Sequence, residues 1–597
     1  MKPFFQHKEI PGIFIFFIIY ACYLWVWINP SLYLIRSYPA FFTDISFLRE
    51  FLYFPGNPAV YISRFITQLY QFALIASFLI SFVLGIIYIC GLHILKNEKY
   101  RHVKAFLPVF VLMLMHNDYK HAMLFDLNIL IVFLFIYLCI SSFRYRNWLS
   151  YISYPTLLAI SLYLNGIFST LLFIYLIFAI QLLRKEKKNS YLIWSLETII
   201  VFMAFYYLYN LSFHDLKLQY IEISRIYSFP FYPLILYAAI LIMPFLVNPF
   251  QSVKSVKIKP VYTLSICVLV ALIALFYTSE KEEKRGLSVQ HYALNEHWEK
   301  ALEYAGTCRY PDKDVVLYTN QALYFTGKIY DDLFLYNQSF GSEGLLSTEI
   351  TNFSGIVPNQ DVFLHLGALS LSIIWGTEAT NVYGANPYVL KNLTKAYLAS
   401  GYIIEADKIV NQLERTPFHK KWAKRYRTLV NDTALINQDP ELHTYKQSQA
   451  PLAVVSTQNI LMNLFLLMKD SKANRMAYDY LLVASLLDHK IEYFASYLTG
   501  LKDYGYTSIP KIYFEGLVYN SLYSSQSPVN IRDYSFDPNI MYRFDTFRQD
   551  LRKALQNPET ASGVLEDTYK DTYWYYLLFR SSLSDEEKVK ILNRMTM

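Results

Sequence analysis

Glycine, proline and cysteine are all scarce in this chain. Its 597 residues include 19 glycines, 23 prolines and 5 cysteines. So few turn-forming residues argue against a disordered chain and against a sheet-rich fold with many tight turns. Four cysteines lie inside apolar segments, and Cys308 stands alone in the second half. A disulfide within that half is therefore excluded, and no CxxC motif or Cys/His cluster predicts a zinc site.

Charge is also scarce, and it is unevenly distributed. Charged residues make up 17% of the chain and apolar residues 54%, whereas soluble proteins usually carry about a quarter charged residues. Up to Thr278 there are 21 Lys and Arg against 10 Asp and Glu, and from Ser279 onward there are 33 against 37. The positive charge belongs to the apolar half. The second half is mildly acidic and has no basic stripe, which argues against nucleic acid as a partner.

Familiar catalytic motifs are absent from the second half. It contains no GxSxG, HExxH, phosphate-binding loop or GxGxxG pattern. The sequence therefore indicates an architecture more directly than it indicates a reaction.

Long apolar segments fill the first half. About 20 apolar residues cross a bilayer core about 30 Å thick, and nine segments reach or approach this length. They are 11–31, 67–93, 104–116, 122–142, 148–165, 167–183, 191–212, 231–247 and 261–278. Segment 104–116 is short, and segment 231–247 contains Pro233 and Pro244. The predicted count is nine spans, within about two.

The basic residues predict how these spans are oriented. With a cytoplasmic N-terminus and alternating spans, 15 of the 21 basic residues of the first half fall on the inside, as cytoplasmic loops require. No cleavage pattern follows the first apolar run, so we expect it to be retained as a span. An odd number of spans predicts a transmembrane domain over 1–279 and an extracytoplasmic domain over 280–597. In a Gram-negative bacterium these would lie in the inner membrane and the periplasm.

The second half has the pattern of paired helices. Ala322 and Gly327 have the same spacing as Ala396 and Gly401, where a small residue lets helices approach and the glycine ends the first helix. Apolar residues at helical spacing follow Gly401, and Pro417 then ends the next helix. The pattern resembles the tetratricopeptide repeat family over the patches 292–335, 387–430 and 475–522, with irregular insertions such as 337–386.

That resemblance implies an α-helical domain that binds proteins or peptides. Ordinary helical hairpins are the alternative. Together the two halves predict an all-α fold class: a polytopic transmembrane bundle followed by a tetratricopeptide-like soluble domain.

The longest gap between spans, 32–66, contains one group of candidate site residues. Asp44 is a candidate catalytic carboxylate, because a carboxylate can act as a base or bind a divalent metal. Three arginines nearby are candidates for gripping a phosphate. They are Arg36, Arg49 and Arg64. The alternative is that Asp44 caps a helix beginning at Ile45 and that Arg49 pairs with Glu50 at the membrane surface.

A second group lies where the third and fourth spans meet. His116, His121 and Asp126 are candidate substrate-binding residues, because ionisable groups at a membrane boundary are costly unless they are paired or face a polar cavity. On a helix, Asp118 would share a face with His121, and His116 with Lys120. The alternative is that Asp126 pairs with Lys120 or another basic residue.

Further carboxylates belong to neighbouring segments. Glu197 lies within the seventh span and is a weaker candidate of the same kind. The outside loop 213–230 would close over the same cavity with three charged residues. They are Asp215, Glu222 and Arg225.

The arrangement of spans, outside loop and tail resembles the GT-C class of polytopic glycosyltransferases. That resemblance implies a sugar donor on a lipid-phosphate carrier, Asp44 in the catalytic position and the arginines facing the donor phosphate. The paired acidic motif of the class is absent here, since Asp44 stands alone. The whole chain also resembles bacterial multi-pass proteins with helical tails.

Three functions follow as hypotheses. The first is a transferase acting on a polyprenyl-phosphate-linked sugar, for which a divalent metal is an open cofactor and no ligand set is predicted. The second is a membrane-anchored scaffold whose helical domain binds an envelope protein. The third is a transporter, which ranks last because the spans contain no clear internal repeat. In all three the lipid bilayer is a partner.

Overall fold

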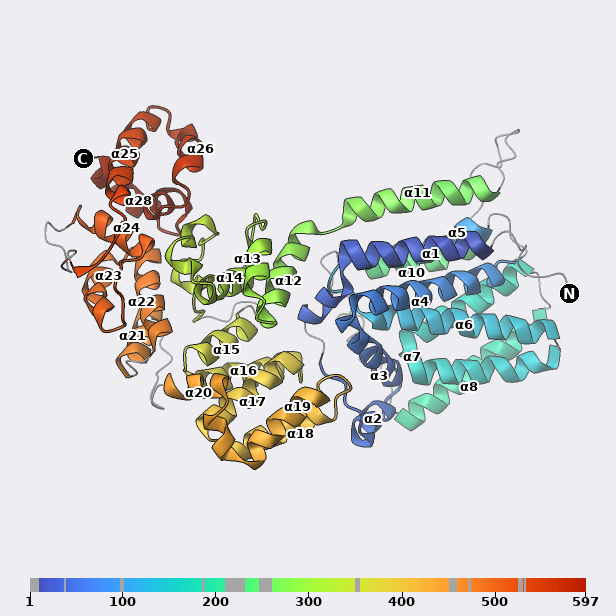
Figure 1. Ribbon diagram of the computed structural model, residues 1–597. Coiled ribbons are helices and arrows are strands. Elements are labelled where there is room, and N and C mark those ends of the chain that lie inside the picture. The colour runs from blue at the N-terminus through green and yellow to red at the C-terminus, as the bar shows by residue number, and fades with distance from the viewer. Residues whose placement is uncertain are drawn as a thin grey trace. The chain divides into compact units, whose positions relative to one another are not determined.

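The chain is helical throughout the part that the structure, a computed structural model, describes (Figure 1). The described residues are 10–36, 39–96, 101–145, 147–184, 188–209, 231–245, 260–348, 355–449, 459–470, 474–523, 530 and 533–596. Within these ranges there is no named strand, only an isolated bridge between Ser508 and Ser535. The predicted all-α fold class is confirmed. Contacts divide the chain into two compact units, Met1–Lys281 and Glu282–Met597.

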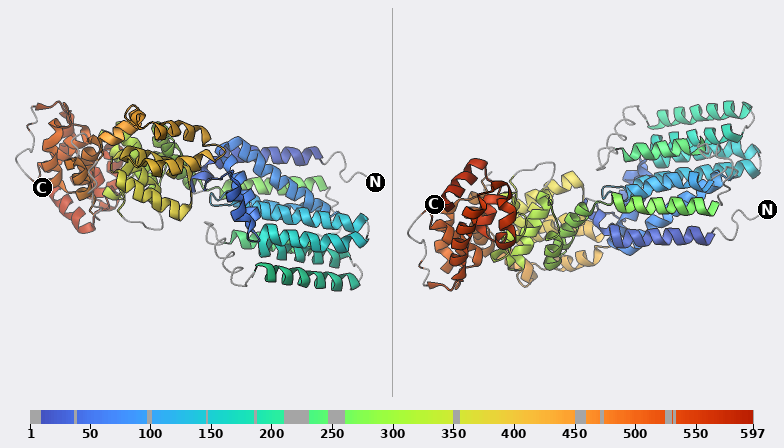
Figure 2. Two further views of the ribbon diagram at one scale, coloured as in Figure 1. Left: turned by 90° about the horizontal axis from the view of Figure 1, so that it is seen from below. Right: turned by 90° about the horizontal axis from the view of Figure 1, so that it is seen from above.

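The first unit is a bundle of apolar helices that lie side by side (Figures 1 and 2). Its long helices are α1 (Ile10–Tyr23, continued by a π-helix over Leu24–Ile28), α4 (Ala73–Ile94), α5 (Arg101–Met115), α6 (Met123–Tyr145), α7 (Asn147–Arg184), α8 (Lys188–Tyr209), α10 (Tyr232–Ile242) and α11 (Pro260–Thr278). Five helical segments are long and apolar enough to cross a membrane: Pro11–Ile28, Ala73–Ile94, Met123–Ser142, Tyr151–Leu182 and Leu192–Tyr209. The count of nine spans stays a prediction.

The outer face of this bundle is apolar. Phe14, Phe82 and Leu208 are 68%, 68% and 73% exposed, and many other large apolar side chains accompany them. Such a surface would be unstable in water, whereas lipid chains cover it at no cost. The first unit is therefore a membrane unit.

The long helix α7 is two helices that meet at a reversal of the chain. Gly166 has φ 74° and ψ −173° in its middle. The rings of Tyr154 and Phe173 are 6.0 Å apart, and the hydroxyls of Ser161 and Thr170 are 3.2 Å apart. In a straight helix residues nine apart are separated by about 13 Å. The two arms therefore fold back on each other, and they coincide with the segments 148–165 and 167–183.

Short helices connect α1 to α4. After a 3-10 helix over Pro30–Arg36 come α2 (Ile45–Leu52), α3 (Asn57–Thr67) and a 3-10 turn over Gln68–Gln71. Phe41, Phe47 and Phe51 form a small core of their own beneath α2 and α3. Because the apolar side chains of α2 and α3 gather on one side, both helices are amphipathic, as expected for helices at a membrane surface.

The second unit consists of shorter helices. They are α12 (Lys281–Leu294), α13 (Trp298–Ala305), α14 (Lys313–Phe325), α15 (Ile356–His365), α16 (Leu369–Tyr383), α17 (Pro387–Ser400), α18 (Ile403–Glu414), α19 (Lys420–Asn431), α20 (Pro440–Gln447), α21 (Ile460–Asp470), α22 (Arg475–Leu487), α23 (Ile491–Leu498), α24 (Lys511–Asn520), α25 (Asn539–Ala554), α26 (Pro558–Tyr569), α27 (Tyr573–Tyr575) and α28 (Asp585–Thr596).

Paired helices occupy the patches expected to contain them. Gly401 ends α17 with φ 81°, and Gly327 follows α14 with φ 73°, a conformation in which only glycine is unstrained. The expectation of an irregular insertion over 337–386 is wrong, because α15 and α16 lie within it. Both helices are apolar enough to join the core, and the periodicity of this segment was obscured by its polar residues. The tetratricopeptide type of the repeat stays a prediction.

Candidate functional site

Three of the predicted site residues converge inside the membrane unit. The ligand atoms of His116, His121 and Asp126 all lie within 4.8 Å of one another. Nε2 of His121 is 2.9 Å from Oδ2 of Asp126, and Nε2 of His116 is 3.3 Å from the same oxygen. The two imidazole rings are 4.3 Å apart and meet edge to face. All three side chains are about 1% exposed, so the cluster is sealed from solvent within the unit.

The cluster is incompletely hydrogen-bonded. Within the described part of the chain, Nδ1 of His116 and Oδ1 of Asp126 have no hydrogen-bond partner, and Nε2 of His116 meets only Asp126, at 3.3 Å. Buried polar atoms are nearly always paired, because an unpaired one costs about 1 to 3 kcal/mol. A buried cluster of ligand atoms with unpaired polar atoms beside it indicates a binding site.

A network of side chains fixes the loop that carries the two histidines. The loop joins α5 to α6, and its Asn117 amide donates to the Leu275 carbonyl at 2.8 Å and to the Thr278 hydroxyl at 2.7 Å. The Tyr23 hydroxyl donates to the Asn117 carbonyl at 3.0 Å. The loop is thereby tied to α1 and to α11, which are far from it in sequence.

Two further tyrosines tie the same loop to the segment that follows Tyr23: Tyr33 from that segment, and Tyr119 from the loop. The Tyr33 hydroxyl donates to the backbone carbonyl of His116, and the Tyr119 hydroxyl donates to the Ile28 carbonyl at 2.7 Å. These bonds fix the backbone that carries the two imidazoles, and a fixed backbone is one condition for a precise ligand site.

The expected helical spacing of these residues is wrong. It placed Asp118 on one face with His121, and His116 with Lys120. The alternative, in which Asp126 pairs with Lys120 or another basic residue, is met by the two histidines and not by Lys120. The helix α5 ends at Met115 and α6 begins at Met123, so the loop between them does not have helical spacing. Its turns place both histidines against Asp126 instead.

Sequence reasoning also missed Tyr20. This side chain is 1% exposed, its hydroxyl has no hydrogen-bond partner within the described residues, and its ring stacks on that of Tyr23 with the ring centres 6.1 Å apart. A tyrosine within an apolar span is commonly part of an aromatic belt, so no sequence signal distinguishes it.

Two imidazoles and one carboxylate form a set of ligands that suits a divalent transition metal. Imidazole favours zinc, iron and related ions, whereas magnesium and calcium prefer oxygen ligands alone. Three protein ligands leave coordination positions open for water or substrate. The residues present therefore fit such an ion, although the sequence alone predicted no metal site.

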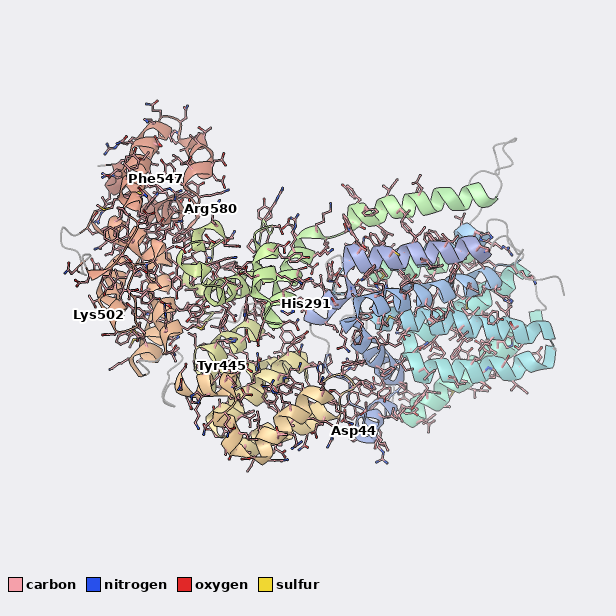
Figure 3. The ribbon with its side chains drawn as sticks, in the orientation of Figure 1. Asp44, His291, Tyr445, Lys502, Phe547 and Arg580 are labelled. Carbon is pink, nitrogen blue, oxygen red and sulfur yellow. The ribbon has the colours of Figure 1, made fainter. Side chains whose placement is uncertain are left out.

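Asp44, Arg49 and Arg64 are not part of this group. Asp44 lies at the start of α2 in an extended conformation, half-buried, and accepts a hydrogen bond from the Ser46 hydroxyl (Figure 3). Its carboxylate makes no capping bond to the backbone of α2. Arg49 is exposed in the last turn of α2, and the Arg64 guanidinium lies 5.1 Å from the Phe51 ring centre. Arg36 ends a 3-10 helix, and its side chain lies outside the described residues.

The remaining candidates have little structural support. Glu197 is half-buried in α8, and its Oε2 has no hydrogen-bond partner within the described residues. The predicted loop residues Asp215, Glu222 and Arg225 lie outside the part of the chain that the structure describes.

Comparison with known proteins identifies a family. The sequence model of a family with the description "Family of unknown function (DUF6057)" matches residues 6–580. No curated protein and no solved structure matches the chain.

Proposed function

The chain belongs to DUF6057, a family of unknown function, and from that premise we propose that its membrane unit binds a divalent transition-metal ion at His116, His121 and Asp126. We propose further that the ion serves a glycosyltransferase-like reaction on a polyprenyl-phosphate-linked sugar. The observation that carries the proposal is that two imidazoles and one carboxylate come together in a buried cluster that retains unpaired polar atoms.

The position of the cluster supports the proposed reaction on a lipid-linked sugar. Its loop contacts the segment that follows α1, through Tyr33 and through the carbonyl of Ile28. In the GT-C class that the chain resembles, the corresponding outside segment carries catalytic residues. A metal ion beside it would hold and neutralise a phosphate, because cations stabilise the charge on phosphate oxygens.

The roles of the residues follow from their chemistry. The two imidazoles and the Asp126 carboxylate would be the metal ligands, and Asn117 would position the loop. Asp44 remains the candidate base in this proposal, and Arg36, Arg49 and Arg64 remain candidates for contacting the donor phosphate.

The first experiment is a metal analysis of the full chain purified in lipid nanodiscs. We expect about one transition-metal ion per chain in the wild type, a loss of most of it in Asp126→Asn, and no loss in the matched control Asp44→Asn, because a neutral amide is a much weaker ligand. Equal metal content in the wild type and Asp126→Asn would overturn the metal site.

The second experiment tests the reaction. In proteoliposomes that contain the protein and a radiolabelled polyprenyl-phosphate sugar, water can take the place of the acceptor, so the sugar–phosphate bond should be hydrolysed to free sugar and polyprenyl phosphate. Asp126→Asn should abolish this release. A protein that binds the metal but releases no sugar from this donor would contradict the transferase while leaving the metal site intact.

A scaffold is the second candidate. The second unit buries two separate helical cores, one around Tyr480 and Trp574 and one around Ala396 and Tyr426. Helical layers of this kind present large surfaces for protein partners. We propose an envelope protein as the partner, and co-purification of one protein with the wild type but not with a chain lacking 387–431 would support this role over the transferase.

A further inference from the structure

A cavity of about 730 Å³ opens in the second unit, beside the N-terminus of α22. Its wall includes Tyr330, Arg475, Tyr506 and Phe536, with Asp331 and Asp537 also lining it. Cavities that bind small molecules usually have volumes of about 300 to 1,000 Å³ and combine aromatic walls with a few polar groups. This cavity has the size of a binding pocket, and its wall is mainly polar with a few aromatic side chains. None of the residues of the membrane cluster lines it.

A buried carboxylate organises the wall of the cavity. Asp479 is fully buried and accepts hydrogen bonds from three tyrosines: Tyr330 at 2.7 Å, Tyr513 at 3.1 Å, and Tyr506. Burial of a charge is costly unless several donors surround it. The three hydroxyls satisfy Asp479 and at the same time fix the rings of Tyr330 and Tyr506.

Arg475 lies on this platform with its side chain half exposed. Its guanidinium lies 4.4 Å from the centre of the Tyr506 ring, and its Nε is 3.7 Å from Oδ2 of Asp479. Stacking on the ring and the attraction between Nε and Asp479 orient this guanidinium. Its two terminal nitrogens carry parallel N–H groups, which is the geometry that binds a carboxylate.

The other cation of the cavity is already occupied. The Lys511 ammonium donates to Oδ2 of Asp571 at 2.7 Å and to the Asp331 carbonyl at 3.1 Å. Arg475 is therefore the group that would receive an anion here.

The remaining polar groups of the cavity limit the chemical class of the ligand. Thr507, Ser508 and Ser535 supply hydroxyls, and the exposed carboxylates of Asp331 and Asp537 can only accept hydrogen bonds. A matching ligand needs one carboxylate for Arg475, several hydroxyl donors for the carboxylates, and a flat face for the aromatic rings. An acidic sugar has all three.

We propose that this cavity binds a uronic acid residue of a carbohydrate, with its carboxylate on Arg475 and its ring against Tyr506 or Phe536. The proposal is independent of the metal site and of the transferase reaction.

The test is a titration of the full chain in nanodiscs with digalacturonate, followed by calorimetry. We expect saturable binding by the wild type. Arg475→Gln should weaken binding by about tenfold or more, because a charge-assisted hydrogen-bond pair contributes about 1.5 to 3 kcal/mol. The matched control Arg309→Gln removes an exposed arginine of the same unit that does not line the cavity, and its binding should equal that of the wild type.

Two further measurements separate an effect on folding from an effect on ligand binding. Arg475→Lys keeps the positive charge but loses the paired N–H donors of the guanidinium, so it should melt like the wild type and bind the ligand less tightly. Neutral digalactose has a hydroxymethyl group in place of each carboxylate, so we expect it to bind at least about tenfold more weakly. Equal binding of both sugars, undiminished binding by Arg475→Gln, or no binding of digalacturonate would overturn the proposal. Preferential binding of glutamate or an acidic peptide would replace the sugar with an amino acid ligand and overturn it too.

Discussion

The amide N–H of Gly56 donates a hydrogen bond of 2.8 Å to the carbonyl of Tyr163, one turn before the reversal in α7. The Tyr163 hydroxyl donates in return to the Leu52 carbonyl at 2.9 Å. The turn between α2 and α3 therefore rests on the end of the α7 hairpin. These two bonds join a connection near the start of the chain to helices more than a hundred residues later.

The first prediction concerns Gly56. It has φ +92°, and a Cβ at this position would lie 3.3 Å from the Cα of Gly166. Because both the backbone conformation and the space disfavour a side chain, Gly56→Ala should lower the free energy of unfolding by about 1 to 3 kcal/mol. Thermal unfolding of the membrane unit in detergent measures the loss.

Gly12 provides the comparison for this substitution. It lies in α1, and a Cβ there meets nothing within 4 Å. Gly12→Ala should leave the melting temperature unchanged or raise it slightly, since alanine favours helix. If both variants melt alike, the contact between the turn and the hairpin does not contribute to stability.

The second prediction concerns Asn117 as a positioning residue. Asn117→Ala removes the bonds to Leu275, Thr278 and Tyr23 that hold the metal loop. We expect metal affinity to fall by about 10- to 100-fold while the ligands themselves remain, as is common for supporting residues. Titration with the metal in a competing chelator measures this, and Tyr23→Phe, which loses one bond, should have a smaller effect. An unchanged affinity would mean that the loop holds its shape without these bonds.

The third prediction concerns Asp479. Replacement by Asn puts an amide NH₂ in place of one carboxylate oxygen. A tyrosine hydroxyl that donated to this oxygen must then reverse and accept, and the bonds to the other oxygen lose their charge. Asp479→Asn should destabilise the second unit by about 3 kcal/mol. The exposed Asp503→Asn is the matched control and should be neutral. Calorimetry measures the melting of both variants. An unchanged melting temperature of Asp479→Asn would show that the network contributes no net stability.

The fourth prediction concerns pH. Burial raises the pKa of Glu515 from 4.5 to about 8, although Lys511, the Tyr573 amide and Arg543 oppose this shift and Asp571 adds to it. The folded state thus binds more protons than the unfolded state between about pH 4.5 and about pH 8, so stability is greatest below this window and falls as pH rises through it. Glu515→Gln, which cannot ionise, should remove that part of the pH dependence.

Calorimetry at a series of pH values compares the two proteins directly. The difference in melting temperature between Glu515→Gln and the wild type should change in favour of the variant as pH rises from 5 to 8. Other groups titrate equally in both proteins, so they cancel in the difference. A constant difference would indicate that Glu515 is ionised in the folded protein throughout.

Much of the helical plan could be predicted from the sequence, because long apolar runs have few alternatives to a buried or lipid-facing helix. The break between 148–165 and 167–183 was visible as Asn165-Gly166 within an otherwise apolar run. The helices α15 and α16 were missed, because Asn359, Gln360 and Asp361 interrupt the apolar pattern and are nonetheless buried. Gln360 donates to the Val389 carbonyl, a long-range bond that no local pattern indicates.

The candidate site was predicted in part. His116, His121 and Asp126 could be selected as candidates because they are ionisable residues at a membrane boundary, where such residues are costly without a partner. Their mutual arrangement depends on a turn between two helices and on bonds from Tyr23, Tyr33 and α11. Those contacts join residues far apart in the sequence, so helical spacing could not reveal them.

The reversal at Gly166 has a consequence for how this chain tolerates changes of length. The arms of α7 leave no loop between them, and Ser161 already faces Thr170 across the turn. An epitope tag or a protease site inserted after Asn165 would have to push the arms apart and displace Gly56, whose N–H bonds to Tyr163. Topology mapping by insertion should therefore fail at this connection even though it joins two apolar segments, and variation in length among related chains should avoid it.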